Sequence, residues 1–205
     1  LRAQIFQVPR KRTTLVFDVD SVVLVLYGRQ EGSAVGYNPK KPGRRSYHPI
    51  FCFESHFQEF WHGSLRGGKA GASSGAVGFL RRCLAKAPST IARSRIRFRM
   101  DAGFYGQRIV RLLDGEGCGY VIVVKEYPSI RNRLGGVKFA RMRNGGEAGE
   151  FREKVSRESK TLHRFIVVRR PIPEDPVEAR QLTLFKIQKF AYHVFVTNLK
   201  TSPWR

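Results

Sequence analysis

Three aspartates stand where the neighbouring residues predict the ends of buried strands. Asp18 and Asp20 lie in the apolar run LVFDVDSVVL, and Asp101 follows the run IRFRM. Side chains alternate along a strand, so Asp18 and Asp20 share one face. Carboxylates in apolar surroundings are costly unless they are paired, hydrogen-bonded or bound to a metal ion. If the two strands are neighbours, Asp20 and Asp101 converge on one divalent cation, which indicates metal-assisted chemistry on a phosphodiester.

Two other interpretations of these aspartates follow from the residues. The stretch VFDVDSVV also resembles the opening motif of haloacid dehalogenase-type phosphatases, in which the first acid is the nucleophile. Those enzymes need a later acidic pair, and neither Asp-Asp nor Gly-Asp-x-x-x-Asp occurs downstream, so the phosphatase is the remote alternative. Asp101 can also be the N-cap of a following helix, since it precedes Gly103 and Phe104.

The elements that must position these residues predict a mixed α/β sheet. Strands are expected over 13–26, 47–54, 57–66, 94–100 and 120–125, and a helix over 104–114. A further amphipathic helix is expected from Ala76 to the residues before Pro88, with Ser73 or Ser74 as its N-cap.

From about Pro128 the sequence predicts a β-rich region. Charged, alternating segments cover 138–143, 151–157, 163–170, 182–190 and 192–198, with linkers of glycine and proline between them. The predicted organisation is an α/β core over 13–127, a β-rich insertion over 128–191 and a returning core strand over 192–200.

Positive charge dominates the composition. The 205 residues include 38 Lys and Arg against 16 Asp and Glu, a net charge of +22 that is spread along the chain. Basic side chains that neutralise phosphates release counterions, so this balance predicts a nucleic-acid partner. The hydrophobic share of 41% is typical of a globular protein and excludes general disorder.

Cysteine usage and hydropathy argue against several other classes. Cys52, Cys83 and Cys118 show no Cys-x-x-Cys spacing, so neither a disulfide framework nor a zinc site is indicated, and a reducing cytoplasm is expected. The longest apolar stretch, 22–27, is far shorter than a membrane span, and no secretory signal is visible. A membrane partner is therefore not expected.

The order of several longer blocks resembles the DDE transposases of bacterial insertion sequences. The blocks are DVDSVVLVLYGRQEGSAVGYNPKKPGRRSYHPI, then LRGGKAG, then FRMDAGFYGQRIVRLLDGEGCGYVIVVK. The resemblance covers most of 13–200. It is to the cut-and-paste branch, in which an RNase H-like fold carries a β-rich insertion.

This resemblance implies a DNA transposase that uses Mg²⁺ or Mn²⁺ to hydrolyse transposon ends and then joins the freed 3′-OH to target DNA. The first catalytic acid falls on Asp20, with Asp18 as the alternative, and the second on Asp101; Asp20 and Asp101 are the implied metal ligands. The implied partner is double-stranded DNA, bound by a homodimer in a synaptic complex at the nucleoid of the bacterial cytoplasm.

Five residues are predicted to contact DNA: Arg44, Arg45, Arg99, Tyr105 and Lys125. The arginines and the lysine offer charge to phosphates, and Tyr105 lies beside Asp101, where it can position or stack on DNA. The simpler alternatives are solvated charge for the basic residues and core packing for Tyr105.

The third acid of the family has no counterpart here. In the family it is a Glu on a helix after the strand that closes the insertion; residues 192–199 resemble that strand, and no Tyr-x-x-Arg-x-x-x-Glu block follows. Glu174, Asp175 and Glu178 lie in a proline-flanked turn before it. The sequence is therefore expected to be a C-terminally truncated, catalytically inactive fragment, and a non-catalytic DNA-binding remnant is the alternative function.

Overall fold

The computed structural model describes residues 14–38, 40–125, 127–143, 145–172 and 190–202, so the predicted segment 182–189 lies outside the described residues. The strands are β1 (Leu15–Ser21), β2 (Leu24–Val25), β3 (Ala34–Val35), β4 (Arg45–Tyr47), β5 (Ile50–Glu54), β6 (Glu59–Ser64), β7 (Ile96–Met100), β8 (Gly119–Val124), β9 (Ala140–Arg141), β10 (Glu147–Lys154), β11 (Leu162–Pro171) and β12 (Phe190–Thr197). The helices are α2 (Ala76–Ala85), α3 (Gln107–Gly115) and α4 (Pro128–Leu134), with short 3-10 helices η1 (Arg93–Arg95) and η2 (Ala102–Phe104).

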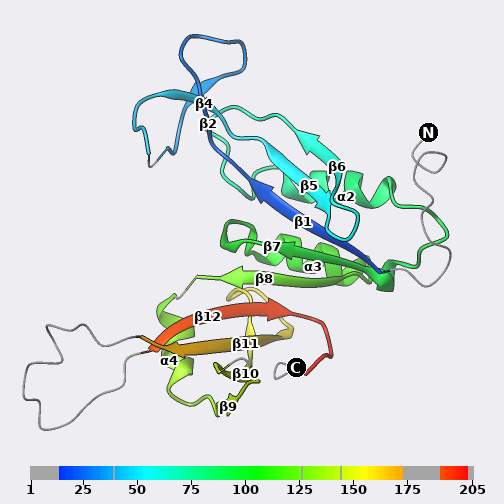
Figure 1. The fold of residues 1–205 in the computed structure, drawn as a ribbon, viewed down its shortest axis with the longest axis vertical. Coiled ribbons are helices and arrows are strands. Elements are labelled where there is room, and N and C mark those ends of the chain that lie inside the picture. The colour runs from blue at the N-terminus through cyan, green and yellow to red at the C-terminus, as the bar shows by residue number, and fades with distance from the viewer. Residues whose placement is uncertain (1–13, 39, 126, 144, 173–189, 203–205) are drawn as a thin grey trace, which may run out of the picture.

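One mixed sheet runs through the described chain in the order β6-β5-β1-β7-β8-β12-β11-β10-β9 (Figure 1). Strands β1, β7 and β8 are parallel neighbours, whereas β5, β6 and β12 are antiparallel to the strands beside them. A small sheet, β2-β4-β3, projects beyond the ends of β1 and β5. The predicted α/β, RNase H-like fold class with an added β-rich part is confirmed.

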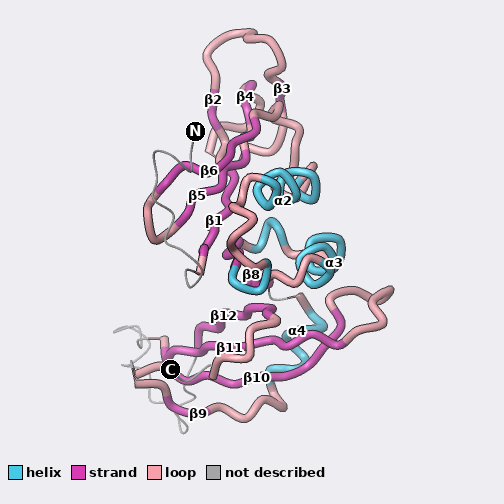
Figure 2. Tube along the Cα trace, turned by 90° about the vertical axis from the view of Figure 1, so that its right-hand side faces the viewer, coloured by secondary structure: helices cyan, strands magenta, loops and turns pink. Residues whose placement is uncertain are grey.

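Helices α2 and α3 cover one face of the core strands (Figure 2). Period-two alternation explains this, because Leu15, Phe17 and Val19 of β1 are buried beneath the helices while the intervening side chains point to the other face. Phe17 anchors the layer: its ring centroid lies 4.8 Å from that of Trp61 and 5.3 Å from that of Phe98.

Three local predictions were wrong. The expected strand over 13–26 divides into β1 and β2, and helix α2 is preceded by Gly75 with a φ of 69° and no side-chain cap instead of by a capping serine. The region from Pro128 begins with helix α4, which the β-rich prediction missed. Its signals are a proline in the first turn and two buried residues four apart, Ile130 and Leu134.

The β-rich strands extend the core sheet. Strand β12 pairs with β8 through the register Val194–Val124 to Thr197–Val121, and β11, β10 and β9 follow in the same sheet. The predicted division into 13–127, 128–191 and 192–200 stays a prediction, since the sheet is continuous across both boundaries.

Candidate functional site: two carboxylates at the ends of parallel strands

Asp20 and Asp101 come together at the carboxyl ends of β1 and β7. The parallel register pairs Asp18 with Arg99 and Val19 with Met100, so the next step along both strands brings Asp20 beside Asp101. Neighbouring strands lie about 4.8 Å apart. The negative charge of Asp20 acts on Asp101 and raises its pKa, which is consistent with this proximity. The sequence-based pairing of these two acids thus corresponds to neighbouring positions in the structure.

The environment of Asp101 disfavours its ionised form. Partial burial is the largest cause that raises the pKa of Asp101, and the charge of Asp20 adds to it. The backbone N–H of Gly103, which donates to Asp101 Oδ1 at 3.0 Å, and the charge of Lys125 act in the opposite direction. The net pKa is raised. Asp101 is also the N-cap of η2, so the capping and the metal-site interpretations are compatible.

Asp18 is engaged elsewhere. Both of its carboxylate oxygens accept from Arg99, at 2.5 Å from Nε and 2.6 Å from Nη2, and Nη2 also donates to Ser55 Oγ at 2.8 Å. This bidentate pair raises the pKa of Arg99 above its ordinary value. The pair occupies Asp18, which favours Asp20 over Asp18 as the metal ligand, and it limits Arg99 as a phosphate contact.

The other predicted DNA contacts fall into two places. Arg44 and Arg45 lie at the small sheet, where Arg44 sits over the Tyr27 ring at 5.7 Å and Arg45 Nε donates to Ser33 Oγ at 2.9 Å. Lys125 directly follows β8, and its charge acts on Asp101.

Tyr105 has the contacts of a packing residue. Its hydroxyl donates to the carbonyl of Val155 at 3.1 Å, its ring lies edge-on to Phe165, and burial raises its pKa to about 12. The structure thus gives Tyr105 the core role that was the alternative to DNA contact.

His48 is a buried residue near Asp20 whose role sequence reasoning missed. Its Nε2 lies 3.2 Å from Ser21 Oγ, its Nδ1 bonds the carbonyl of Ala70, and the Ser21 N–H donates to Asp20 Oδ1 at 2.7 Å. His48 therefore connects the end of β1 to the loop that precedes α2. An isolated histidine without ligand spacing gives no such signal in the sequence.

Arg66 holds the same loop in place, and the loop packs against Gly103, two residues after Asp101. Arg66 Nη1 donates to the carbonyls of Gly71, Ala72 and Ser74, at 3.1, 3.1 and 2.6 Å. Ala72 in turn lies so close to Gly103 that a Cβ at Gly103 would approach the Ala72 Cβ to 2.6 Å. The glycine two residues after Asp101 is therefore required by close packing.

We expect Gly103→Ala to destabilise the protein by about 1–3 kcal/mol, the usual cost of overpacking, and to displace Asp101. Gly106→Ala is the matched control, because nothing lies within 4 Å of its added Cβ and its φ of 174° is ordinary extended backbone. Urea unfolding of both variants measures the difference. Equal stability of the two variants would contradict the close contact between Gly103 and Ala72.

The two carboxylates fit a divalent cation of the Mg²⁺ type. Mg²⁺ is held by one or two carboxylates together with waters and substrate phosphate oxygens, and Asp20 and Asp101 supply that number. Burial raises the pKa of Asp101 most, and the charge of Asp20 adds to it; a bound cation would offset both effects. Among the residues that the structure describes, no group of three or more His, Cys, Asp or Glu is arranged to hold a metal ion.

No helix within the described ranges has the length and apolarity needed to cross a membrane.

Comparisons with known proteins give a matching family and a similar solved structure. A family model described as "Transposase DDE domain group 1" matches residues 1–163. Among solved structures, a similar chain is that of the piggyBac transposase in a synaptic complex with hairpin DNA, at 12% sequence identity and a TM-score of 0.47. The match covers 90% of this chain and 33% of that chain, so this chain spans about a third of the transposase's length. The search of curated proteins returned no match.

Proposed function

The chain belongs to the transposase DDE domain group 1 family, and we propose from this that it supplies Asp20 and Asp101 to the active site of an enzyme that carries out metal-dependent cleavage of transposon-end DNA and strand transfer into target DNA. Asp20 and Asp101 bind Mg²⁺ or Mn²⁺. The observation that carries the proposal is the position of both carboxylates at the ends of adjacent parallel strands. Ligands of α/β sheets bind at that end of the strands.

The residues at this edge of the sheet can take different roles in the reaction. When bound, a divalent ion supplies polarisation of the phosphodiester and a lower pKa for the attacking water. Asp20 and Asp101 hold the site, and the N–H of Gly103 orients the Asp101 carboxylate. Lys125 is close enough to act on Asp101 and can bind a phosphate oxygen of DNA at the same edge. The Arg99 guanidinium is paired with Asp18.

Double-stranded DNA is the proposed partner. The net charge of +22 supports it, and Arg44 and Arg45 extend positive charge onto the small sheet at the end of β1. A homodimer in the synaptic complex and a place at the nucleoid of the bacterial cytoplasm remain parts of this proposal.

A DNA-binding protein without catalysis is the second candidate. It is favoured by the number of candidate metal ligands: the described part of the chain brings two carboxylates together, whereas the transposases that the sequence resembles use three acids. In that case DNA binding persists while bound metal and cleavage are both absent.

Mn²⁺ binding and plasmid nicking test the proposal together. Electron paramagnetic resonance should report Mn²⁺ bound by the protein, and Asp20→Asn and Asp101→Asn should each abolish that signal. Glu31→Gln, an exposed carboxylate in the loop between β2 and β3, should leave it unchanged. Metal-dependent nicking of supercoiled DNA that survives in both aspartate variants would overturn the proposal, whereas DNA binding without any Mn²⁺ binding would support the second candidate.

A further inference from the structure

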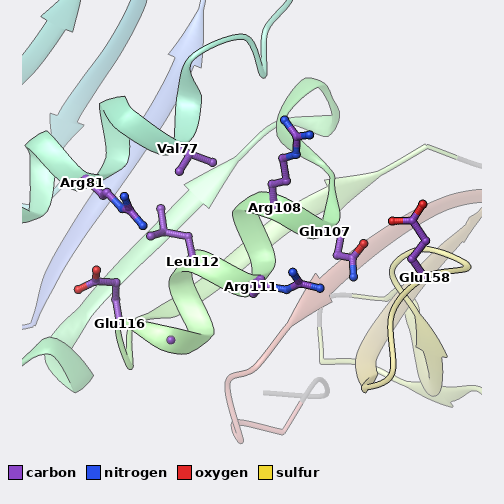
Figure 3. Close-up of a pocket in the computed structure, with 9 residues that line it drawn as sticks. Val77, Arg81, Gln107, Arg108, Arg111, Leu112, Glu116 and Glu158 are labelled. Atoms are coloured by element: carbon purple, nitrogen blue, oxygen red, sulfur yellow. The ribbon is translucent and has the colours of Figure 1, made fainter.

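A groove about 480 Å³ in volume lies on the outer side of the helix layer, between α2 and α3. We call it the α2–α3 groove. It is lined by Val77 and Arg81 from α2 and by Arg108, Arg111 and Leu112 from α3 (Figure 3). The turn that holds Glu158 forms one side, and Gln107 Oε1 fixes that turn to α3 by accepting from Ser156 Oγ at 2.8 Å.

The three groove arginines have no ion pair or hydrogen bond from their side chains within the described ranges. Several other arginines do form ion pairs: Arg99 with Asp18, Arg133 with Glu153, Arg164 with Glu150 and Arg169 with Glu147. Two carboxylates, Glu116 and Glu158, also line the groove, but neither forms an ion pair with the three arginines. The groove therefore presents guanidinium donors without internal acceptors.

The groove also leads toward the carboxylate edge. Gln107 and Arg108 open α3 only a few residues after Asp101, while Gly115 and Glu116 lie at the other end of the helix. A helix of nine residues is about 13.5 Å long. A strand of nucleic acid that passes the carboxylates could therefore continue along the groove with successive phosphates facing the arginines.

We propose that the α2–α3 groove binds the phosphodiester backbone of DNA as a second contact surface, separate from Asp20 and Asp101. The choice of DNA rests on the proposed function and on the charge balance of the chain. Guanidinium groups bind phosphate oxygens in bidentate geometry, and the half-open shape admits a continuous strand.

The salt dependence of DNA binding tests this surface. Arg81, Arg108 and Arg111 are replaced together by glutamine, and binding of a fluorescein-labelled duplex of arbitrary sequence is followed by anisotropy in EDTA. Each phosphate contact contributes a slope of about 0.9 in log K against log salt, so three contacts amount to about 2.7. The ratio of parent to variant affinity should then shrink by about 40-fold between about 50 and 200 mM salt.

A second triple variant removes the same charge from another surface. Arg141, Arg143 and Arg170 lie in the β-rich part, are all exposed, and do not line the α2–α3 groove. Their replacement by glutamine should change the slope by less than one unit. An equal slope change in both triple variants, or none in the groove variant, would overturn the proposal. Polyglutamate that competes with DNA as strongly as unlabelled duplex does would also overturn it.

The same experiment separates this inference from the proposed function. Asp20→Asn and Asp101→Asn should keep the full salt slope in EDTA, because they leave the groove intact. If the parent binds DNA and the groove variant keeps its slope, the groove inference fails and the function stands. If the parent does not bind DNA at all, both fail.

Discussion

Replacing Asp101 by asparagine is expected to raise the free energy of unfolding in EDTA near neutral pH. The folded protein raises the pKa of Asp101 above its ordinary value of 3.8, chiefly through burial and then through the charge of Asp20. The stability that such a group contributes is complete below its unfolded pKa and is lost as pH rises through the folded pKa. Near neutral pH the ionised Asp101 therefore destabilises the folded state. Asparagine carries no charge, so it removes this destabilisation, and its side-chain oxygen still accepts the N-cap hydrogen bond from Gly103. The gain should vanish below about pH 3, where both states are protonated.

The same substitution should remove stabilisation by Mg²⁺. A ligand at a hundred times its Kd stabilises the folded state by about 2.7 kcal/mol, which for a chain of this size is about 5–10 °C in Tm. Asp101→Asn should lose this shift, and Glu31→Gln should keep it. Differential scanning calorimetry in EDTA and in excess Mg²⁺ measures both effects. A variant that is less stable than the parent in EDTA and still stabilised by Mg²⁺ would contradict this account of the site.

Glu54→Ala is expected to cost about 2–6 kcal/mol of stability, because it leaves two backbone donors without an acceptor and each such loss costs about 1–3 kcal/mol. Glu54 is fully buried at the end of β5, where its carboxylate accepts from the N–H of Val16 at 2.9 Å and from the N–H of Phe57 at 2.8 Å. His56 Nδ1 lies 3.3 Å from the same carboxylate. Alanine leaves two backbone donors without an acceptor, one in β1, the strand that carries Asp20, and one in the turn between β5 and β6.

Two further variants calibrate that loss in urea unfolding. Glu54→Gln keeps one side-chain oxygen as an acceptor, so it should cost less than alanine. Glu31 is exposed, so Glu31→Ala should change the free energy of unfolding by no more than about 0.5 kcal/mol. A Glu54→Ala variant as stable as Glu31→Ala would show that the carboxylate does not hold these two backbone groups.

Sequence pattern was informative where local rules decide the outcome. The positions of Asp20 and Asp101 at strand ends follow from apolar runs that stop at an acid, and their adjacency follows from a parallel pairing that the α/β order favours. The transposase family is confirmed by the matched family model. Helix α4 was missed because basic residues obscured its two buried positions, Ile130 and Leu134.

Features that depend on distant partners had no sequence signal. The Asp18–Arg99 pair joins residues from two strands, and only the parallel register shows that they face one another. Nothing in the sequence around Glu54 indicates its burial, which depends on a contact with the start of β1. The α2–α3 groove likewise appears only when two helices are packed together, since neither helix alone distinguishes its arginines from solvated charge.

The continuity of the nine-stranded sheet has a consequence for association between copies of the chain. Without β12, strand β8 would expose a row of unpaired backbone N–H and C=O groups, which are a template for pairing with another molecule. Strands β12, β11 and β10 extend the sheet beyond β8, and β9 pairs with only the first two residues of β10. The strands that follow the core thus pair the backbone of β8 within the chain, so this strand is not available for pairing with a second molecule.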